Sequence, residues 1–200
     1  MLRLSLSNSR QLFFLLEPKL KVSIIVPTLN EALIIDPGSR AEDIISIIDQ
    51  NSWGPLAVFN THAHYDHIGA ISDLIDYYGI PIYLHGDDMD LLKRANMYKL
   101  VFESSQSIRL PPQVLDLKDL NGKVNVGHFS FSWIPTPGHT NGGVCYAFPG
   151  CLFTGDTLFI GDVGRPDLAI TNNITKEELA GNLYDSLRNK IMTLEDNVLI

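Results

Sequence analysis

The feature that most constrains this chain is a cluster of candidate metal ligands at residues 61–67. The segment reads THAHYDH, so three histidines and one aspartate lie within six consecutive positions. It directly follows the short apolar run 57–59, which is typical of a strand. A lone histidine is most often a hydrogen-bonded polar residue, but imidazole and carboxylate groups this close together suit zinc or iron. The cluster therefore predicts a metal site directly after a strand.

The spacing within this cluster indicates which side chains can converge. Residues two apart in an extended segment point the same way, so His62 and His64 can reach one ion. Asp66 and His67 lie where a helix is predicted to begin, and they can serve a second, neighbouring position. A paired site of this kind holds its metals about 3.5–4 Å apart. Taken alone, Asp66 could equally be a helix N-cap.

Two further segments place a candidate ligand just after a predicted strand. His139 follows the predicted strand 129–133, and Asp156 follows the predicted strand 152–153. In both cases a glycine precedes the candidate ligand and permits a close approach of the backbone. Each segment alone reads as an ordinary turn. Together with the first cluster, both become candidate metal ligands.

These three segments, in this order, resemble the signature of the metallo-β-lactamase superfamily. The resemblance runs from about Val22 to Ile200 and implies an α+β fold, an αββα sandwich with two divalent metal ions at one edge of its sheets. For the first ion it implies three histidine ligands: His62, His64 and His139. For the second ion it implies Asp66 and His67, with Asp156 as a bridge between the two ions.

The same resemblance assigns a supporting role to Asp36. This residue ends the predicted strand 32–35 and precedes a Pro-Gly turn. Its carboxylate is expected to orient the histidine segment from outside the ligand set. From the residues alone, Asp36 is equally well an ordinary turn acid.

The apolar pattern predicts a layered domain of alternating strands and helices. Strands are expected at 22–26, 32–35, 57–59, 81–84, 129–133, 144–148, 152–153 and 197–200. Helices are expected at 41–50, 66–78, 87–102 and 176–192. The chain has 200 residues, a length that suits a single metallo-β-lactamase-like domain over 1–200.

Composition and charge argue against several kinds of partner. The formal net charge is −8 and no stripe of Lys and Arg is present, which disfavours nucleic acid. No apolar run reaches the roughly 20 residues that span a bilayer, so we expect no membrane partner. Cys145 and Cys151 lack metal or redox spacing, and we expect two buried thiols in a reducing compartment.

The N-terminal segment 1–16 admits two interpretations. It contains arginine and serine and no acidic residue, as in a leader that directs a protein to mitochondria or plastids. Alternatively, Gln11 to Leu16 forms a first strand behind a polar leader. Without a targeting leader, the expected location is cytoplasmic.

One ligand of the resembled family is not found in this sequence. The family supplies a further histidine from a loop after its last strand, and this sequence stops at Ile200, where that loop should begin. His85 and His128 lie at other places in the pattern, and His85 is expected to be structural or peripheral. We therefore expect a truncated product or fragment. In a complete chain, the second metal position would be compromised.

The sequence after Asp156 indicates a branch of the family. A Gly-Arg-x-Asp element that contains Arg165 and Asp167 looks like the glyoxalase II-like hydrolases and the related persulfide dioxygenases. Arg165 is expected either to contact the substrate or to form an ion pair with Asp167. The helical segment 178–192 looks like the dioxygenases that are fused to rhodanese domains, whereas the first cluster looks like the thioester hydrolases.

The favoured hypothesis is a glyoxalase II-like thioesterase. In that reaction a metal-bound hydroxide attacks the carbonyl of an acylated glutathione. Three residues are assigned to catalysis: Asp66, His62 and His64. The expected cofactor is a pair of divalent ions, with zinc preferred and iron as the alternative. The acyl group and the oligomeric state stay open.

Two other classes compete with this hypothesis. The first is an iron-dependent persulfide dioxygenase, with a mononuclear site of two histidines and one carboxylate: His62, His139 and Asp156. The second is a catalytically silent binding or scaffold protein, which the missing final histidine supports. A true β-lactamase is disfavoured because no secretory signal peptide is found, and the acidic charge disfavours the nucleic-acid-processing branch.

Overall fold

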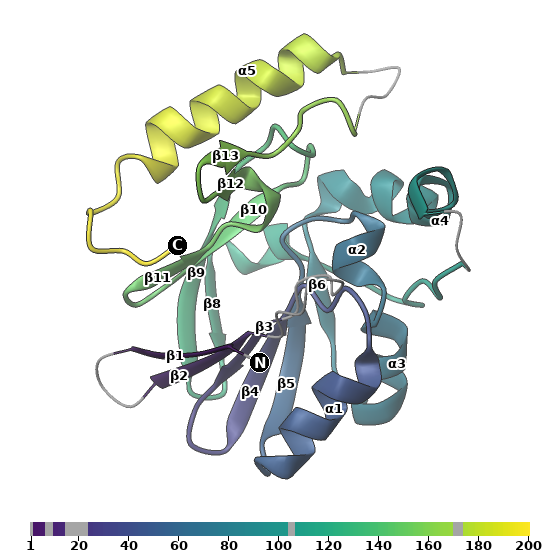
Figure 1. The fold of residues 1–200 in the computed structure, drawn as a ribbon, viewed down its shortest axis with the longest axis vertical. Coiled ribbons are helices and arrows are strands. Elements are labelled where there is room, and N and C mark those ends of the chain that lie inside the picture. The colour runs from purple at the N-terminus through teal and green to yellow at the C-terminus, as the bar shows by residue number, and fades with distance from the viewer. Residues whose placement is uncertain (1, 7–9, 15–23, 104–106, 170–173) are drawn as a thin grey trace.

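In the computed structural model of the chain, two β-sheets pack face to face between layers of helices (Figure 1). The structure describes residues 2–6, 10–14, 24–103, 107–169 and 174–200.

The larger sheet has seven strands in sequential order. They are β1 (Leu2–Leu6), β2 (Arg10–Phe14), β3 (Ile24–Pro27), β4 (Glu31–Ile35), β5 (Gly54–Phe59), β6 (Ile82–Leu84) and β7 (Leu115–Asp116). Strands β1 to β4 pair antiparallel, whereas β4 to β7 pair parallel. The carboxyl ends of parallel strands meet at one edge, so the loops after β4, β5 and β6 leave the sheet side by side.

The smaller sheet is antiparallel, in the order β11–β10–β9–β8. Its strands are β8 (Lys123–Val126), β9 (Phe129–Pro135), β10 (Val144–Phe148) and β11 (Cys151–Phe153). A short hairpin follows, formed by β12 (Leu158–Phe159) and β13 (Asp162–Val163).

The α-helices are α1 (Ala41–Gln50), α2 (Tyr65–Ile68), α3 (Ile71–Tyr78), α4 (Met89–Glu103) and α5 (Lys176–Ser186). Short 3₁₀ turns are η1 (Gly86–Asp88), η2 (Leu117–Leu120) and η3 (Gly155–Thr157), and a π-helical turn η4 (Leu187–Ile191) continues α5. Helices α1 to α4 lie on the side of the larger sheet, and α5 crosses the other end of the molecule over the smaller sheet (Figure 1).

Separate apolar clusters fill the spaces between these layers. Strand β4 shows how they arise, because alternate side chains point to opposite faces of a strand. Ala32 and Ile34 belong to the cluster beneath the helices, whereas Leu33 and Ile35 belong to the cluster between the sheets. The third cluster, on the outer face of the smaller sheet, centres on Cys145, Leu152 and Ile191. The αββα arrangement expected from the sequence is thereby confirmed.

The single helix predicted over 66–78 is wrong. The structure forms two helices, α2 and α3, with a break at Gly69 and Ala70. The Ala70 backbone N–H donates to the Pro37 carbonyl at 2.9 Å. A Cβ atom at Gly69 would lie 2.2 Å from the Gly38 carbonyl oxygen. The loop after β4 therefore packs against the break, a tertiary contact that helical periodicity does not contain.

The helix predicted over 176–192 is also only partly α-helical. It is α-helical as far as Ser186 and then continues as the π-helical turn η4. The predicted strand 197–200 contributes a single parallel bridge, between Leu199 and Cys151. Two helical forms in succession present the same apolar periodicity, so the sequence pattern did not separate them.

Near the N-terminus the structure contains strands. Residues 10–14 form β2, so the described part of the segment Gln11 to Leu16 is a strand, but β1 (Leu2–Leu6) precedes it and the expected polar leader contains that strand. Positions 15 and 16 lie outside the described residues, as do Val22 and Ser23 of the predicted strand 22–26. The targeting interpretation stays a prediction.

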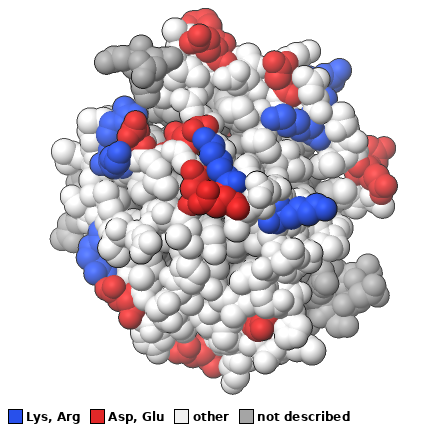
Figure 2. All heavy atoms as spheres, turned by 180° about the vertical axis from the view of Figure 1, so that it is seen from behind, with Lys and Arg blue, Asp and Glu red and all other residues white. Residues whose placement is uncertain are grey.

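Charged side chains of both signs are mixed on the surface. On the face shown in Figure 2, Lys and Arg lie beside Asp and Glu, and the described residues there form no continuous basic patch. Among the described residues, Lys118 pairs with Asp87 at 2.6 Å and Arg109 with Asp76 at 2.8 Å. Within the described part of the chain, no helix combines the length and apolar character needed to cross a bilayer.

A buried hydroxyl joins the two sheets. Tyr146 on β10 is fully buried between them and donates to the Asn60 carbonyl at the end of β5, at 2.7 Å. We expect Tyr146→Phe to lower the free energy of unfolding by about 1–3 kcal/mol, because a buried carbonyl loses its donor. Urea unfolding at neutral pH measures this difference.

The control is Tyr77→Phe, which removes an exposed hydroxyl bonded to Asp49 at 3.0 Å. That surface variant should change the free energy of unfolding by no more than about 0.5 kcal/mol. Equal losses in the two variants would show that the bond between the sheets contributes no more than a solvated one.

Candidate metal centre

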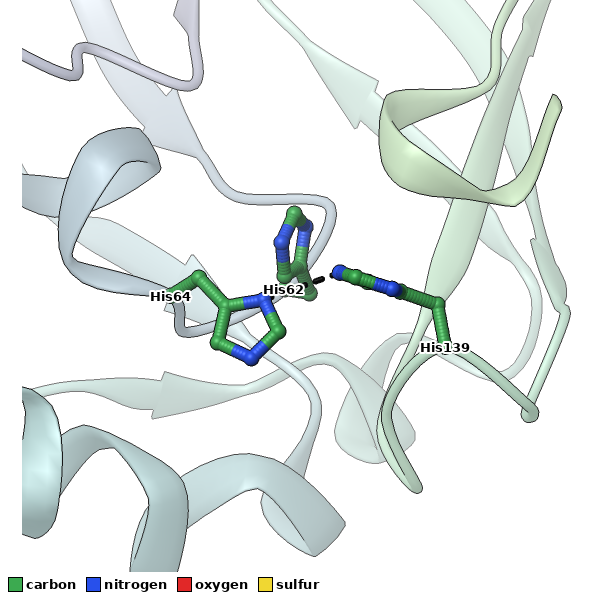
Figure 3. A group of neighbouring side chains, drawn as sticks. All are labelled: His62, His64 and His139. Carbon is green, nitrogen blue, oxygen red and sulfur yellow. Dashed lines mark hydrogen bonds between the residues drawn. The ribbon is translucent and has the colours of Figure 1, made fainter. Parts of the chain in front are cut away.

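The candidate ligands meet at the edge of the two sheets. The histidine segment follows β5, the loop that carries His139 follows β9, and Asp156 lies in η3 after β11. The Val144 backbone N–H donates to the Thr61 carbonyl at 2.9 Å and ties the smaller sheet to the histidine segment. Three imidazole rings are turned toward one another in Figure 3: His62, His64 and His139.

These three histidines are buried and offer one nitrogen each to a common point. The nitrogens lie within 4.8 Å of one another. His139 Nε2 is 2.9 Å from His64 Nδ1. His62 Nε2 is buried and has no hydrogen-bond partner among the described residues.

Neighbouring groups determine which nitrogens carry hydrogen. Thr61 Oγ1 donates to Asp36 Oδ2 at 2.6 Å and lies 3.0 Å from His62 Nδ1, so it accepts from that nitrogen. This leaves His62 Nε2 with a lone pair and no donor. His139 Nδ1 likewise donates to the Arg165 carbonyl at 2.8 Å, which frees His139 Nε2. Buried imidazole lone pairs directed at one point fit a zinc or iron ion.

Asp156 lies between two histidines. Its Oδ1 is 3.2 Å from His67 Nε2, and its Oδ2 is 3.4 Å from His139 Nε2. The carboxylate therefore faces both groups of nitrogens that the family resemblance assigned to two different ions. Asp156 belongs to neither group of converging ligand atoms within the described residues, so its role as a bridge stays a prediction.

Asp36 anchors the histidine segment. Its Oδ1 accepts from the Thr61 backbone N–H at 2.7 Å and from Asn60 Nδ2 at 3.3 Å. Its Oδ2 accepts from Thr61 Oγ1, and it lies 3.0 Å from His67 Nδ1. The supporting position expected for Asp36 is the one observed, and the carboxylate orients His67 so that Nε2 faces Asp156.

A second group of candidate ligand atoms contains Asp36, His62 and His67. The contacts of Asp36 argue against reading this group as a metal site. Both of its oxygens already accept hydrogen bonds, and its contact with His67 uses Nδ1, the nitrogen that points away from Asp156. We therefore interpret this group as the support of the site.

Asp66 is the predicted ligand that the structure places least directly. It lies in α2 beside His67 and is partly buried. It is not a member of either group of converging ligand atoms within the described residues. Its charge nevertheless acts on the pKa of His139, behind the larger effects of burial, Asp156, Arg165 and His67. Its role as a ligand stays a prediction.

Arg165 contributes to the site through its backbone carbonyl, and its side chain pairs with Asp167. The Arg165 carbonyl holds His139 Nδ1, as described above. The guanidinium forms two hydrogen bonds to Asp167, from Nε to Oδ1 at 3.0 Å and from NH2 to Oδ2 at 2.8 Å. The ion pair that the sequence suggested is present. The Arg165 side chain is 66% exposed, which leaves it accessible to a ligand.

The environment makes three of these histidines weak bases. Burial lowers the pKa of His62 well below its usual value, and neighbouring imidazoles add to this effect. Burial and the nearby His139 lower the pKa of His64 to about 3, and burial also lowers the pKa of His139. Neutral imidazoles are the form that binds a metal.

His67 behaves in the opposite way. Burial lowers its pKa, but Asp36 and Asp156 on either side raise it more, so the pKa of His67 lies well above its usual value. Two carboxylates that favour a proton on this ring also favour any other cation between them. The centre as a whole therefore combines weakly basic imidazoles with carboxylates, the donor set of a divalent metal site.

Asp88 is a site residue that our sequence reasoning missed. It is 1% exposed and accepts hydrogen bonds from both histidine-bearing loops, through Ala63, Thr140 and Gly142. Burial raises its pKa to about 6, against the opposing effect of these bonds. A signal existed: Asp88 follows β6, and a polar residue after a parallel strand lies at the same edge as those after β4 and β5.

The remaining histidines and the cysteines belong to neither group of converging ligand atoms within the described residues. His85 is buried, accepts from the Asp87 backbone N–H at 3.3 Å and packs its ring against Trp133, a structural role as expected. His128 is exposed and contacts Glu31 through Nδ1 at 2.9 Å. Both cysteines are free and buried, which confirms that expectation: Cys145 and Cys151.

Comparison with known proteins places these features in a family. The Metallo-beta-lactamase superfamily matches residues 21–198 of the chain. A protein of Bacillus subtilis (strain 168) described as probable metallo-hydrolase YqgX is 32% identical over 173 residues, which cover 86% of this chain and 78% of that protein.

Solved structures agree with this similarity. The crystal structure of BLEG-1 B3 metallo-beta-lactamase superposes with a TM-score of 0.80 at 30% identity, over 94% of this chain and 88% of that one. The crystal structure of TTHA1623 in a di-iron-bound form superposes with a TM-score of 0.75 at 31% identity, over 90% and 85%. The similarity therefore spans the fold and the segments that carry the candidate ligands.

The lowered pKa of His64 predicts how stability depends on pH. The folded chain disfavours a proton that the unfolded chain binds near pH 6.5, so the contribution of His64 is complete above that pH and is lost as the pH falls toward 3. Relative to His64→Gln, the metal-free wild type should lose up to about 1.4 kcal/mol per pH unit between pH 6 and 4. Urea unfolding in the presence of a chelator measures both curves, and parallel curves would contradict the assignment.

The close packing of Gly138 against α5 yields a further prediction. Gly138 has φ +145°, and a Cβ atom there would lie 2.4 Å from Leu183 backbone atoms. We expect Gly138→Ala to lower the free energy of unfolding by about 3 kcal/mol, through backbone strain and overpacking. Gly150→Ala is the control, because Gly150 has φ +85° with open space around it. Thermal unfolding should show a clearly larger loss at position 138, and equal losses would exclude the packing contribution.

Proposed function

Because the chain belongs to the metallo-β-lactamase superfamily, we propose that it is a metal-dependent hydrolase that cleaves thioesters of glutathione. The coarser part of this statement, a metallo-hydrolase, follows from the family and from the probable metallo-hydrolase of Bacillus subtilis. The thioester substrate is our own inference, based on the Gly-Arg-x-Asp element around Arg165.

We propose two metal positions. One ion is assigned three histidine ligands: His62, His64 and His139. The second is assigned Asp66 and His67, and Asp156 is assigned to both. Zinc suits this mixture of imidazole and carboxylate donors, and iron is the alternative that the di-iron form of the similar protein TTHA1623 supports.

The position of Asp156 is the observation that carries this proposal. Each of its oxygens faces the Nε2 atom of a different histidine, at 3.2 Å for His67 and 3.4 Å for His139. A site with one ion and three ligands needs neither His67 nor a carboxylate shared in this way. The arrangement therefore favours a paired, hydrolytic centre over a mononuclear one.

When bound, a pair of divalent ions would lower the pKa of a water molecule and polarise a carbonyl group. The chain itself supplies the remaining functions in this proposal. The Asp66 carboxylate, at the start of α2, accepts a proton from the attacking water and orients it. The exposed guanidinium of Arg165 releases Asp167 and binds a carboxylate of the glutathione moiety in its place.

The proposal is tested with S-lactoylglutathione and a chromogenic thiol reagent, on protein whose metal content is measured by mass spectrometry. We expect zinc, or a mixed pair that approaches two ions per chain, and release of the thiol. Asp66→Ala should lower kcat/KM by about 10²–10⁴-fold, the range for loss of a positioned base. Asp73→Ala is the control, since Asp73 is an exposed carboxylate paired with Arg109, and should retain wild-type activity within about twofold.

Other outcomes identify the competing functions. Oxygen uptake with glutathione persulfide, iron near one ion per chain and no thiol release would replace the hydrolase by a persulfide dioxygenase. An unimpaired Asp66→Ala variant would remove Asp66 from the mechanism. Tight metal binding without either activity would leave the metal centre in place and overturn the substrate class.

A further inference from the structure

We infer that Asp88 is a positioning residue that sets the separation of the two histidine-bearing loops and thereby the metal affinity of the centre. The inference deepens the proposed function, because it rests on the metal position assigned to His64 and His139. It concerns binding of the metal, so it can be tested independently of the substrate.

The carboxylate of Asp88 contacts both loops at once. Its Oδ2 accepts from the Ala63 backbone N–H at 3.0 Å and from Thr140 Oγ1 at 2.9 Å. Its Oδ1 accepts from the Gly142 backbone N–H at 2.7 Å. On the first loop, Ala63 directly precedes His64. On the second loop, Thr140 and Gly142 follow His139 by one and three positions.

The two loops come from different sheets. The segment with His64 follows β5 of the larger sheet, and the segment with His139 follows β9 of the smaller sheet. Their rings face each other with His64 Nδ1 and His139 Nε2 only 2.9 Å apart. Asp88 comes from a third place, the turn η1 after β6, and a carboxylate there can hold the two loops in register.

The chemistry of the three contacts calls for a carboxylate. All three partners are donors, and an ionised carboxylate accepts without carrying a hydrogen of its own. An asparagine has the same shape, but its amide nitrogen would face a donor, either Gly142 or the pair formed by Ala63 and Thr140. The contact is also close, because a Cβ atom at Gly142 would lie 2.7 Å from the Asp88 backbone nitrogen.

The burial of this carboxylate supports a role in the site. Asp88 is 1% exposed, and its hydrogen-bond partners among the described residues are neutral N–H and O–H groups. A buried carboxylate held by neutral groups is costly to keep ionised. The neighbouring Asp87, in contrast, is exposed and pairs with Lys118. We therefore assign Asp88 to the support of the metal centre.

The test measures the dissociation constant of Zn²⁺ by competition with a chromogenic chelator, on the full chain at constant pH. Asp88→Asn should weaken Zn²⁺ binding about 10- to 100-fold, the usual effect of losing a group that orients metal ligands. The melting temperature of each metal-free variant is measured in parallel. Asp88→Asn is expected to remain folded, because it keeps the shape of the side chain and two of the three bonds.

Two control variants separate positioning from loss of stability. Ile44→Val trims a fully buried side chain of α1 that is neither a candidate ligand nor a partner of Asp88, and should lower the melting temperature while Zn²⁺ affinity stays within about threefold of the wild type. Thr140→Val removes one donor to Asp88 and should weaken Zn²⁺ binding. Thr140→Ser keeps the hydroxyl and should bind Zn²⁺ as the wild type does.

The possible results of these measurements separate the positioning role of Asp88 from the metal centre and from the proposed substrate. Wild-type Zn²⁺ affinity in Asp88→Asn, or an equal loss in Ile44→Val, overturns the positioning role. A wild-type chain that binds no Zn²⁺ overturns the metal centre and this inference together. A wild-type chain that binds Zn²⁺ but releases no thiol overturns the proposed substrate alone.

Discussion

The architecture of the site depends on buried carboxylates that accept hydrogen bonds from loop backbones. Asp36, at the end of β4, accepts from Thr61 and holds the start of the histidine segment. Asp88, after β6, accepts from Ala63 in the same segment and from the loop behind His139. The histidine segment leaves the strand between these two, so it is held from both sides. Asp88 thereby adds to the bonds from Val144 to Thr61 and from Tyr146 to Asn60, which also join the two sheets beside the site.

Electrostatics explains why these residues lie together in a buried place. Burial lowers the pKa of His62, His64 and His139 and keeps these rings in the neutral form that coordinates a metal. Asp36 and Asp156 act in the opposite direction on His67, whose pKa is raised. The centre therefore combines three weakly basic imidazoles with two carboxylates that hold His67 between them. Imidazole and carboxylate groups in this combination form the donor set of a divalent metal site.

Local patterns predicted most of the layered fold. The strand predicted at 32–35 and the helix predicted at 41–50 appear in the structure as β4 and α1. The failures lie where tertiary contacts override periodicity. The break between α2 and α3 arises because Ala70 bonds to Pro37, and the π-helical turn after Ser186 has the same apolar spacing as a helix.

The sequence by itself determined the candidate ligands, because a metal site needs particular side chains, and the sequence gives their types and spacing directly. His62, His64, His139 and Asp156 could be named from spacing and family resemblance alone. Only the tertiary structure decided which groups support them. The contact between Asp88 and Thr140 joins residues 52 positions apart, and the choice of nitrogen on each ring follows from neighbours such as the Arg165 carbonyl. Such partners are set by the pairing of strands and the packing of two sheets, and neither is local in sequence.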